Sequence, residues 1–150
     1  MCRSDFALES PHIPVMDTLD GLWQLAAAAR ERFDGQVVAI TGSSGKTSTR
    51  TIVGAVLSRH FDGAVLTTTA NTNNHVGVPQ NLLRLTPEHR GAVLELGTST
   101  PGEIRPLTAL VEPDIAILTN VGPVHLEGLG SVDGVAREKA GVFSKLGDHG

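Results

Sequence analysis

Residues 36–47 read Gln-Val-Val-Ala-Ile-Thr-Gly-Ser-Ser-Gly-Lys-Thr, and this stretch decides the fold of the chain. The run from Gln36 to Thr41 is apolar and rich in β-branched residues, which is typical of a buried strand. A glycine-rich turn follows, and the residues from Thr47 to about His60 predict a helix. A strand, a glycine turn and a helix in this order form the setting in which a loop binds phosphate.

The turn from Gly42 to Thr47 has the residue types that phosphate binding requires. Glycines allow the backbone to aim successive N–H groups at phosphate oxygens, and the helix N-terminus adds unpaired N–H groups and partial positive charge. Lys46 is then expected to reach the β- and γ-phosphates, and the Thr47 hydroxyl to ligate Mg²⁺. The residues predicted to line the nucleotide are Gly42, Ser43, Ser44, Gly45, Lys46, Thr47 and Ser48.

The loop departs from the general phosphate-loop pattern at one position. That pattern places a glycine five residues before the Gly-Lys pair, where this chain has Ile40. Only the shorter form Gly-x-x-Gly-Lys-Thr therefore matches. A glycine turn with a solvated lysine is the alternative interpretation, but the flanking strand and helix favour phosphate binding. The loop alone does not distinguish a ligase from a kinase, a GTPase or an ATPase.

Strands and helices alternate along the rest of the chain. Apolar residues spaced three or four apart from Thr18 onward predict an amphipathic helix that ends near Asp34 and Gly35. Thr100 and Glu103 have the spacing of a capping box around Pro101, which predicts a helix that begins after Thr100. The other predicted strands are 64–67, 92–96 and 115–118, and the other predicted helices are 78–84 and 131–144.

This alternation predicts an α/β fold, a three-layer P-loop NTPase-like domain with a mostly parallel sheet. Residues 1–17 contain Pro11 and Pro14 and predict an irregular, extended segment. The chain ends at residues 147–150, soon after a predicted helix, so the sheet is expected to be truncated.

The composition of the 150 residues is that of an ordinary soluble domain, with 40% hydrophobic and 19% charged residues. A net charge of −4 and an aromatic content of 3% argue against nucleic-acid binding, which needs positive charge or stacking platforms. The single cysteine, Cys2, excludes an internal disulfide. Neither a signal-peptide run nor a membrane-spanning apolar stretch is present, so a cytoplasmic protein without a membrane partner is expected.

Several blocks, in a fixed order, resemble the Mur ligase family. They are the loop at 40–47, Asn-Thr-Asn-Asn-His-Val-Gly-Val-Pro at 71–79, Glu-Leu-Gly at 95–97, Pro-Gly-Glu-Ile at 101–104, and Thr-Asn-Val-Gly-Pro-Val-His-Leu-Glu-Gly-Leu-Gly-Ser at 119–131. The resemblance covers roughly residues 12–150 and is more specific than the loop alone. It implies an ATP-dependent peptide ligase, in which ATP converts a carboxylate into an acyl phosphate and an incoming amine displaces the phosphate.

The resemblance also implies roles for single residues, with ATP and Mg²⁺ as cofactors. Glu95, at the end of a predicted strand, corresponds to a Mg²⁺ ligand. His125 corresponds to a ligand of a second Mg²⁺, through its neutral imidazole. Lys139 corresponds to a lysine that is carbamylated in several Mur ligases and then supports that second metal. The alternatives are an exposed carboxylate, a solvated loop histidine and a surface lysine.

Asparagines complete the predicted site. Asn120 is expected either to contact the nucleotide or to shape the phosphate loop. Asn73 and Asn74 are expected near the γ-phosphate, with Asn74 assigned to nucleotide binding, although their sequence context leaves open which of the two matters.

The residues of these blocks favour the branch of the family whose substrates are a UDP-N-acetylmuramoyl peptide and D-alanyl-D-alanine. Thr98-Ser99-Thr100 and Gly141 depart from that branch, so folylpolyglutamate-type and cyanophycin-type ligases remain alternatives. Residues 1–17 are expected to be the tail of an N-terminal substrate domain, 18–150 an incomplete central ATP-binding domain, and the C-terminal domain to be absent. Such a fragment would bind nucleotide without completing ligation. A nucleotide-binding module that works through a partner chain is the remaining alternative.

Overall fold

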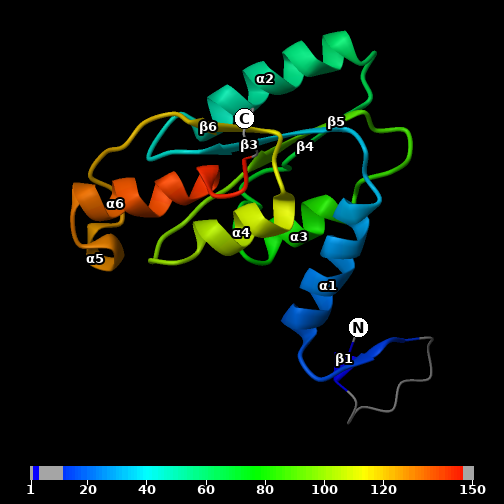
Figure 1. The fold of residues 1–150 in the computed structure, drawn as a ribbon, viewed down its shortest axis with the longest axis horizontal. Coiled ribbons are helices and arrows are strands. Elements are labelled where there is room, and N and C mark those ends of the chain that lie inside the picture. The colour runs from blue at the N-terminus through cyan, green and yellow to red at the C-terminus, as the bar shows by residue number, and fades with distance from the viewer. Residues whose placement is uncertain (1, 4–11, 147–150) are drawn as a thin grey trace.

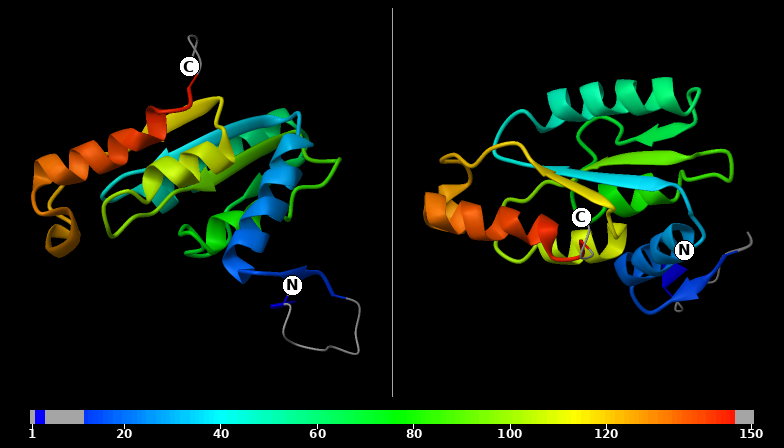
Figure 2. Two further views of the ribbon diagram at one scale, coloured as in Figure 1. Left: turned by 60° about the horizontal axis from the view of Figure 1, so that its bottom comes forward. Right: turned by 45° about the horizontal axis from the view of Figure 1, so that its top comes forward.

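A four-stranded parallel sheet forms the centre of the molecule, in a computed structural model that describes residues 2–3 and 12–146. The strand order is β4-β5-β3-β6. The strands are β3 (Gln36–Thr41), β4 (Val65–Thr67), β5 (Gly91–Glu95) and β6 (Ile115–Leu118). Helix α2 covers one face, and α1, α3 and α4 lie on the other (Figures 1 and 2). The predicted three-layer α/β fold with a parallel sheet is confirmed.

The helices alternate with the strands as the sequence predicts. They are α1 (Thr18–Glu31), α2 (Lys46–His60), α3 (Gly77–Leu82), α4 (Ile104–Val111), α5 (Leu126–Leu129) and α6 (Val132–Lys139), followed by the 3₁₀ helix η1 (Ala140–Phe143). Asp17 caps α1, because its carboxylate accepts hydrogen bonds from the N–H groups of Leu19 and Asp20.

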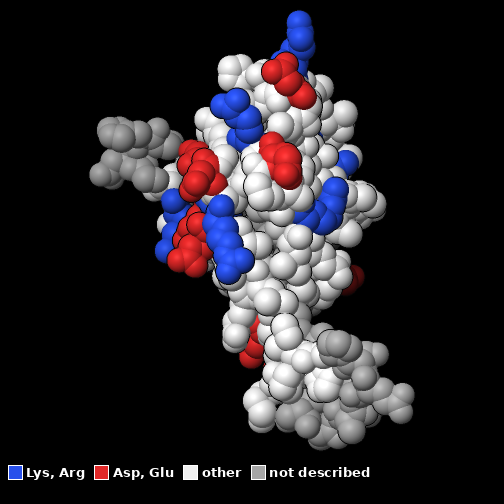
Figure 3. All heavy atoms as spheres, turned by 90° about the vertical axis from the view of Figure 1, so that its right-hand side faces the viewer, with Lys and Arg blue, Asp and Glu red and all other residues white. Residues whose placement is uncertain are grey.

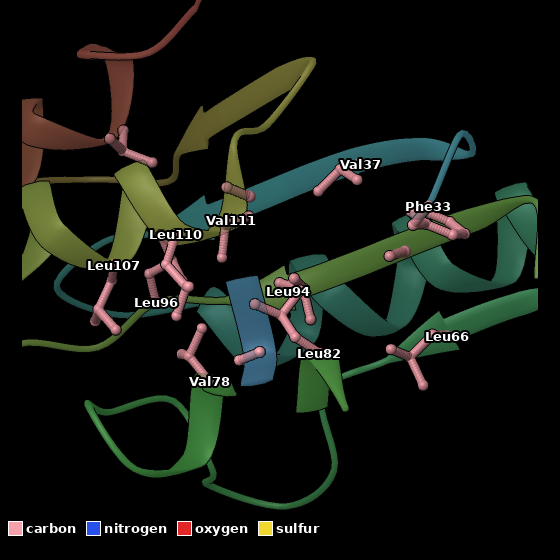
Figure 4. Close-up of a cluster of buried hydrophobic side chains, with 14 of the residues drawn as sticks. Phe33, Val37, Leu66, Val78, Leu82, Leu94, Leu96, Leu107, Leu110 and Val111 are labelled. Atoms are coloured by element: carbon pink, nitrogen blue, oxygen red, sulfur yellow. The ribbon is translucent and has the colours of Figure 1, made fainter. Parts of the chain in front are cut away.

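Side-chain alternation along β3 gives each face of the sheet its own core. Val37 and Ala39 belong to the larger cluster, which the helices opposite α2 cover (Figure 4), whereas Val38 and Ile40 pack with residues of α2. Strand β5 alternates in the same way, with Val93 on the α2 side. Glu95, two residues later, therefore faces the same side as α2. Each fully buried Val or Leu side chain contributes about 1.5–3 kcal/mol to folding.

Helix α4 begins later than the capping-box pattern predicts. Its first residue is Ile104, and residues 101–103 form a turn in which Gly102 has a φ of +87°, outside the right-handed helical region. Half of the predicted box is present, since the Glu103 carboxylate accepts a hydrogen bond from the Thr100 N–H at 3.0 Å. The α4 N-terminus is capped from another helix, because Glu138 accepts the Ile104 N–H at 2.8 Å.

Two further boundaries differ from the prediction. The helix expected over 131–144 divides at Lys139, where α6 gives way to η1. Within the segment expected to be irregular, Cys2–Arg3 (β1) and Pro14–Val15 (β2) pair in parallel beside the start of α1 (Figure 1). The chain's last four residues, 147–150, lie outside the described part, as do residues 1 and 4–11.

Acidic and basic side chains are interspersed on the surface shown in Figure 3. In the described part of the chain, no helix has both the length and the apolar character needed to cross a membrane.

Candidate functional site

The predicted phosphate loop connects the end of β3 to the start of α2, in the strand–loop–helix setting that the motif requires. Because β3 pairs with both β5 and β6, the carboxyl ends of the three strands lie together beside the loop. Ligand sites in open parallel sheets occupy this edge.

Gly42 allows the loop to pass close to the residue that follows β6. Its φ is +150°, and a Cβ atom built there would lie 1.8 Å from the Thr119 hydroxyl. That hydroxyl donates to the Ser44 carbonyl oxygen at 2.6 Å and fixes the loop against β6. No residue with a side chain fits at position 42 unless the loop moves.

Asn120 hydrogen-bonds to the predicted phosphate loop. Of the two roles that the sequence left open, these contacts favour shaping the loop. The Ser43 N–H donates to the Asn120 carbonyl oxygen at 3.1 Å, and the Ser44 N–H donates to the Asn120 side-chain oxygen at 2.9 Å. Its amide nitrogen donates to the Ser44 hydroxyl at 2.7 Å. Two N–H groups that we expected to face phosphate are therefore directed at Asn120 in this structure.

The N-terminus of α2 presents further N–H groups that suit phosphate binding. Gly45 is the N-cap, and the N–H groups of the first helical residues, Lys46, Thr47 and Ser48, have no carbonyl partner within the helix. They give the loop a partial positive charge. The Lys46 ammonium donates to the Gly42 carbonyl oxygen at 2.9 Å, so it folds back over the loop.

Glu95 lies beside the N-terminus of α2 and is 2% exposed. One of its oxygens accepts a hydrogen bond from the Asn73 amide at 2.8 Å, and the other accepts one from the Thr47 hydroxyl at 3.1 Å. Arg50 approaches that second oxygen at 3.6 Å. The structure thus brings together two of the predicted metal ligands, Thr47 and Glu95.

The described residues near the loop suit Mg²⁺ in their donor chemistry. A carboxylate and a hydroxyl are hard oxygen donors, and Mg²⁺ usually takes one or two carboxylates, with phosphate oxygens and waters completing its octahedron. Among the described residues, no three His, Cys, Asp or Glu side chains gather into a metal-binding group. The arrangement therefore fits an ion that is shared with a bound phosphate.

The two neighbouring asparagines have different surroundings. Asn73 donates to Glu95, whereas the side-chain oxygen of Asn74 accepts the N–H groups of Val76 and Gly77 at the start of α3. Asn73 is thus the one directed at the predicted metal ligand. The assignment of Asn74 to nucleotide binding stays a prediction.

Lys139 is buried at the end of α6, with an exposed fraction of 1%. Burial lowers the pKa of its ammonium group, and the positive charge of Lys46 lowers it further, while Glu138 opposes both effects. The alternative that Lys139 is a surface lysine is wrong, because its side chain is buried. A lowered pKa increases the fraction of neutral amine, which is the reactive form.

His125 and Glu95 belong to strand ends that are not adjacent in the sheet. His125 follows β6, which pairs with β3, and β3 separates β6 from β5, which carries Glu95. The residue is exposed, has a φ of +52° and precedes α5. Its role as a metal ligand stays a prediction.

Arg50 and Glu138 were missed by sequence reasoning. Arg50 lies one helical turn after Lys46, and this i, i+4 spacing places both cations on one side of α2. Glu138 accepts N–H groups from Gly102 and Ile104, which ties α6 to the turn that follows β5. Only the spacing of Arg50 is a signal that the sequence could have provided.

A separate cavity of about 870 Å³ lies at the amino ends of β3 and β5. Its lining includes Arg32, Phe33, Phe61, His89 and Arg90. Since the phosphate loop follows the carboxyl end of β3, this cavity is not part of the nucleotide site.

A parallel sheet covered on both faces, with a phosphate loop between an inner strand and a helix, defines a nucleotide-binding domain of the P-loop class. Residues 40–150 match the family described as Mur ligase middle domain. The chain belongs to this family.

Two of the related sequences carry the same enzyme name. The chain is 45% identical over 143 residues to UDP-N-acetylmuramoyl-tripeptide–D-alanyl-D-alanine ligase of Escherichia coli (strain K12), in an alignment that covers 95% of this chain and 31% of that enzyme. It is 41% identical over 138 residues to the enzyme of the same name from Bacillus subtilis (strain 168), with coverages of 92% and 30%.

Solved structures agree with the sequence relatives. A crystal structure of MurF from Acinetobacter baumannii has a TM-score of 0.92 at 39% identity, covering 99% of this chain and 33% of that one. MurF ligase from Thermotoga maritima in complex with ADP has a TM-score of 0.85 at 32% identity, with coverages of 97% and 34%. The chain therefore spans about a third of the length of these relatives.

Proposed function

We propose that the full-length protein is an ATP-dependent ligase that joins D-alanyl-D-alanine to a UDP-N-acetylmuramoyl tripeptide in peptidoglycan precursor synthesis. The observation that carries the proposal is the contact between Thr47 and Glu95 at the start of α2, directly after the phosphate loop. The enzyme name shared by the E. coli and B. subtilis relatives supports this choice of substrates over the folylpolyglutamate and cyanophycin types.

The proposed reaction begins with phosphoryl transfer from ATP to the tripeptide carboxylate, which forms an acyl phosphate and leaves ADP. Lys46 and the N–H groups at the start of α2 bind the phosphates and offset the negative charge that develops on the transferring group. To do so, Lys46 exchanges its contact with the Gly42 carbonyl for phosphate oxygens. Thr47 and Glu95 would hold Mg²⁺ beside the phosphates, where the ion would supply further positive charge. The incoming amine then attacks the acyl phosphate and displaces inorganic phosphate.

Lys139 is proposed to act as a carbamate. A neutral lysine amine adds to carbon dioxide and releases one proton to solvent, which leaves a carbamate with one negative charge. Burial and Lys46 both favour the neutral amine. The product would convert a buried cation near Lys46 into an anion that pairs with it. His125 is proposed to support a second Mg²⁺ once substrates are bound, and Asn74 to act on the γ-phosphate side.

The proposal assigns the remaining requirements to other parts of the protein. Residues 18–150 form the ATP-binding part, and residues 1–17 connect to a substrate-binding domain. Closure over the nucleotide and the incoming amine needs a further domain. We propose a cytoplasmic location, in which neither a membrane nor a nucleic acid is a partner.

Phosphate release by the full-length protein tests the proposal. With ATP, Mg²⁺ and UDP-N-acetylmuramoyl tripeptide present, adding D-alanyl-D-alanine should cause phosphate release, and adding L-glutamate or L-aspartate should not. Lys46→Ala should abolish the release, whereas Arg59→Ala, on the exposed end of the same helix, should retain it. Release that needs glutamate instead, or none with any muramoyl acceptor, would refute the assignment.

A further inference from the structure

Arg50 lies in the candidate metal site although an arginine cannot ligate a metal. Its guanidinium is 3.6 Å from the Glu95 oxygen that also accepts the Thr47 hydroxyl. This is the one ion pair found among the described residues, and its side chains are only 13% and 3% exposed. Solvent screening is therefore weak, and the positive charge acts at close range.

A second contact holds Arg50 in place. The same guanidinium nitrogen donates to the Ala70 carbonyl oxygen at 2.9 Å, at the start of the segment that leads to Asn73. The position of Arg50 on α2 and this hydrogen bond fix the cation independently of Glu95. Its charge therefore remains beside the carboxylate when another cation approaches.

The local charge balance disfavours a metal ion that arrives alone. Glu95 carries one negative charge, and Arg50 already offsets it at the oxygen that faces Thr47. Lys46 adds another positive charge at the loop. A divalent cation gains little from a carboxylate that is already paired, whereas a bound nucleotide adds several negative charges next to it.

We propose that Arg50 is the resident counter-cation of Glu95 and makes metal binding at Thr47 and Glu95 depend on bound nucleotide. The inference rests on the proposed function, because it assumes that the loop binds ATP. In this scheme Arg50 sets the order of binding, because the metal enters with the phosphates and does not occupy the site beforehand. Arg50 is a positioning residue in this scheme, since it acts through Glu95.

Binding of Mn²⁺ to the nucleotide-free, full-length protein tests the proposal, with free Mn²⁺ followed by electron paramagnetic resonance. At a separation of about 5 Å, repulsion by a unit positive charge lowers the affinity for a divalent ion more than tenfold, even at the dielectric constant of water. Arg50→Gln should therefore bind Mn²⁺ at least tenfold more tightly than wild type. Arg50→Met, a second neutral variant, should behave in the same way.

Two controls separate charge from other effects. Arg50→Lys keeps the charge and should stay within about threefold of wild type, and so should Arg59→Gln at the exposed end of α2. Unchanged or weaker Mn²⁺ binding in both neutral variants would overturn the proposal. Micromolar Mn²⁺ binding by nucleotide-free wild type, lost in Glu95→Gln, would overturn it without any Arg50 variant.

ATP binding distinguishes the two proposals. If the folded wild-type protein binds no ATP in the presence of Mg²⁺, the proposed function itself fails. If it binds ATP and the neutral Arg50 variants leave Mn²⁺ affinity unchanged, only the inference about Arg50 fails.

Discussion

A methyl group at position 97 would break the hydrogen bond between Asn73 and Glu95. A Cβ atom built on Gly97 lies 2.7 Å from the side-chain oxygen of Asn73 and 2.8 Å from its Cγ atom. Ordinary contacts begin at 3.4 Å, so the Asn73 carboxamide must retreat by about 0.7 Å. Because the Asn73 backbone is also held, its carbonyl oxygen accepting the Gly97 N–H at 2.7 Å, the side chain has to rotate away.

The cost of Gly97→Ala follows from the bond that is lost. The Asn73 amide donates to the buried carboxylate of Glu95 at 2.8 Å, and hydrogen bonds to charged groups contribute about 1.5–3 kcal/mol. We expect the variant to lose about 2 kcal/mol of unfolding free energy, or about 4–8 °C in midpoint temperature for a chain of this size. Asn73→Ala removes the same bond and should cost a similar amount.

A double-mutant cycle in urea, followed by circular dichroism of the 150-residue chain, tests this reasoning. With Asn73 already shortened to Ala, a methyl at position 97 meets no carboxamide, so the second change should add less than about 0.5 kcal/mol. Full additivity of the two changes would refute the account, and so would a Gly97→Ala variant as stable as wild type.

Three further predictions concern neighbouring residues. Burial raises the pKa of Glu103, but hydrogen bonds from the Thr100 and Ser99 N–H groups outweigh it and hold that pKa below 4.5. At neutral pH, wild type should therefore be about 1 kcal/mol more stable than Glu103→Gln. This difference should vanish as the pH falls below the lowered pKa of the carboxyl, and urea unfolding midpoints measured at decreasing pH would show it. In protein whose Lys139 is not carbamylated, Lys139→Met should stabilise the fold by about 1 kcal/mol at neutral pH, since it removes a buried ammonium group. Because the pKa of Lys139 is lowered from 10.5 in the folded state, the unfolded state binds more protons. The difference in unfolding free energy between wild type and Lys139→Met should therefore shrink as the pH rises toward that value. A destabilised Met variant would contradict this. Asn120→Ala removes the two hydrogen bonds that hold Ser44, so the loop loses part of its fixed shape. Calorimetry should detect roughly tenfold weaker ATP binding. Unchanged affinity would show that the loop holds its shape without Asn120.

Local sequence was enough to predict the elements that form the site. The run before Gly42 and the helix after Thr47 follow from composition and spacing within a few residues of the loop. The position of Glu95 at the end of a parallel strand was enough to place it beside the loop, because carboxyl ends of such strands share one edge.

Contacts between distant segments could not be predicted in this way. Asn73 and Asn74 are equivalent in the sequence, and only the path of the chain after Ala70 directs Asn73 at a carboxylate on another strand. The start of α4 depends on Glu138, which lies 34 residues after Ile104 on α6. Spacing along the chain does not encode such cross-element hydrogen bonds.

Calorimetric titration of ATP in the presence of Mg²⁺ tests the central claim that residues 42–48 form a working nucleotide site. The wild-type chain should bind ATP, and Lys46→Ala should bind at least tenfold more weakly because it loses a charge-assisted contact to phosphate. Arg59→Ala, which removes a cation from the exposed end of the same helix, should bind as wild type does. Failure of folded wild-type protein to bind ATP, or equal binding by Lys46→Ala, would contradict the claim.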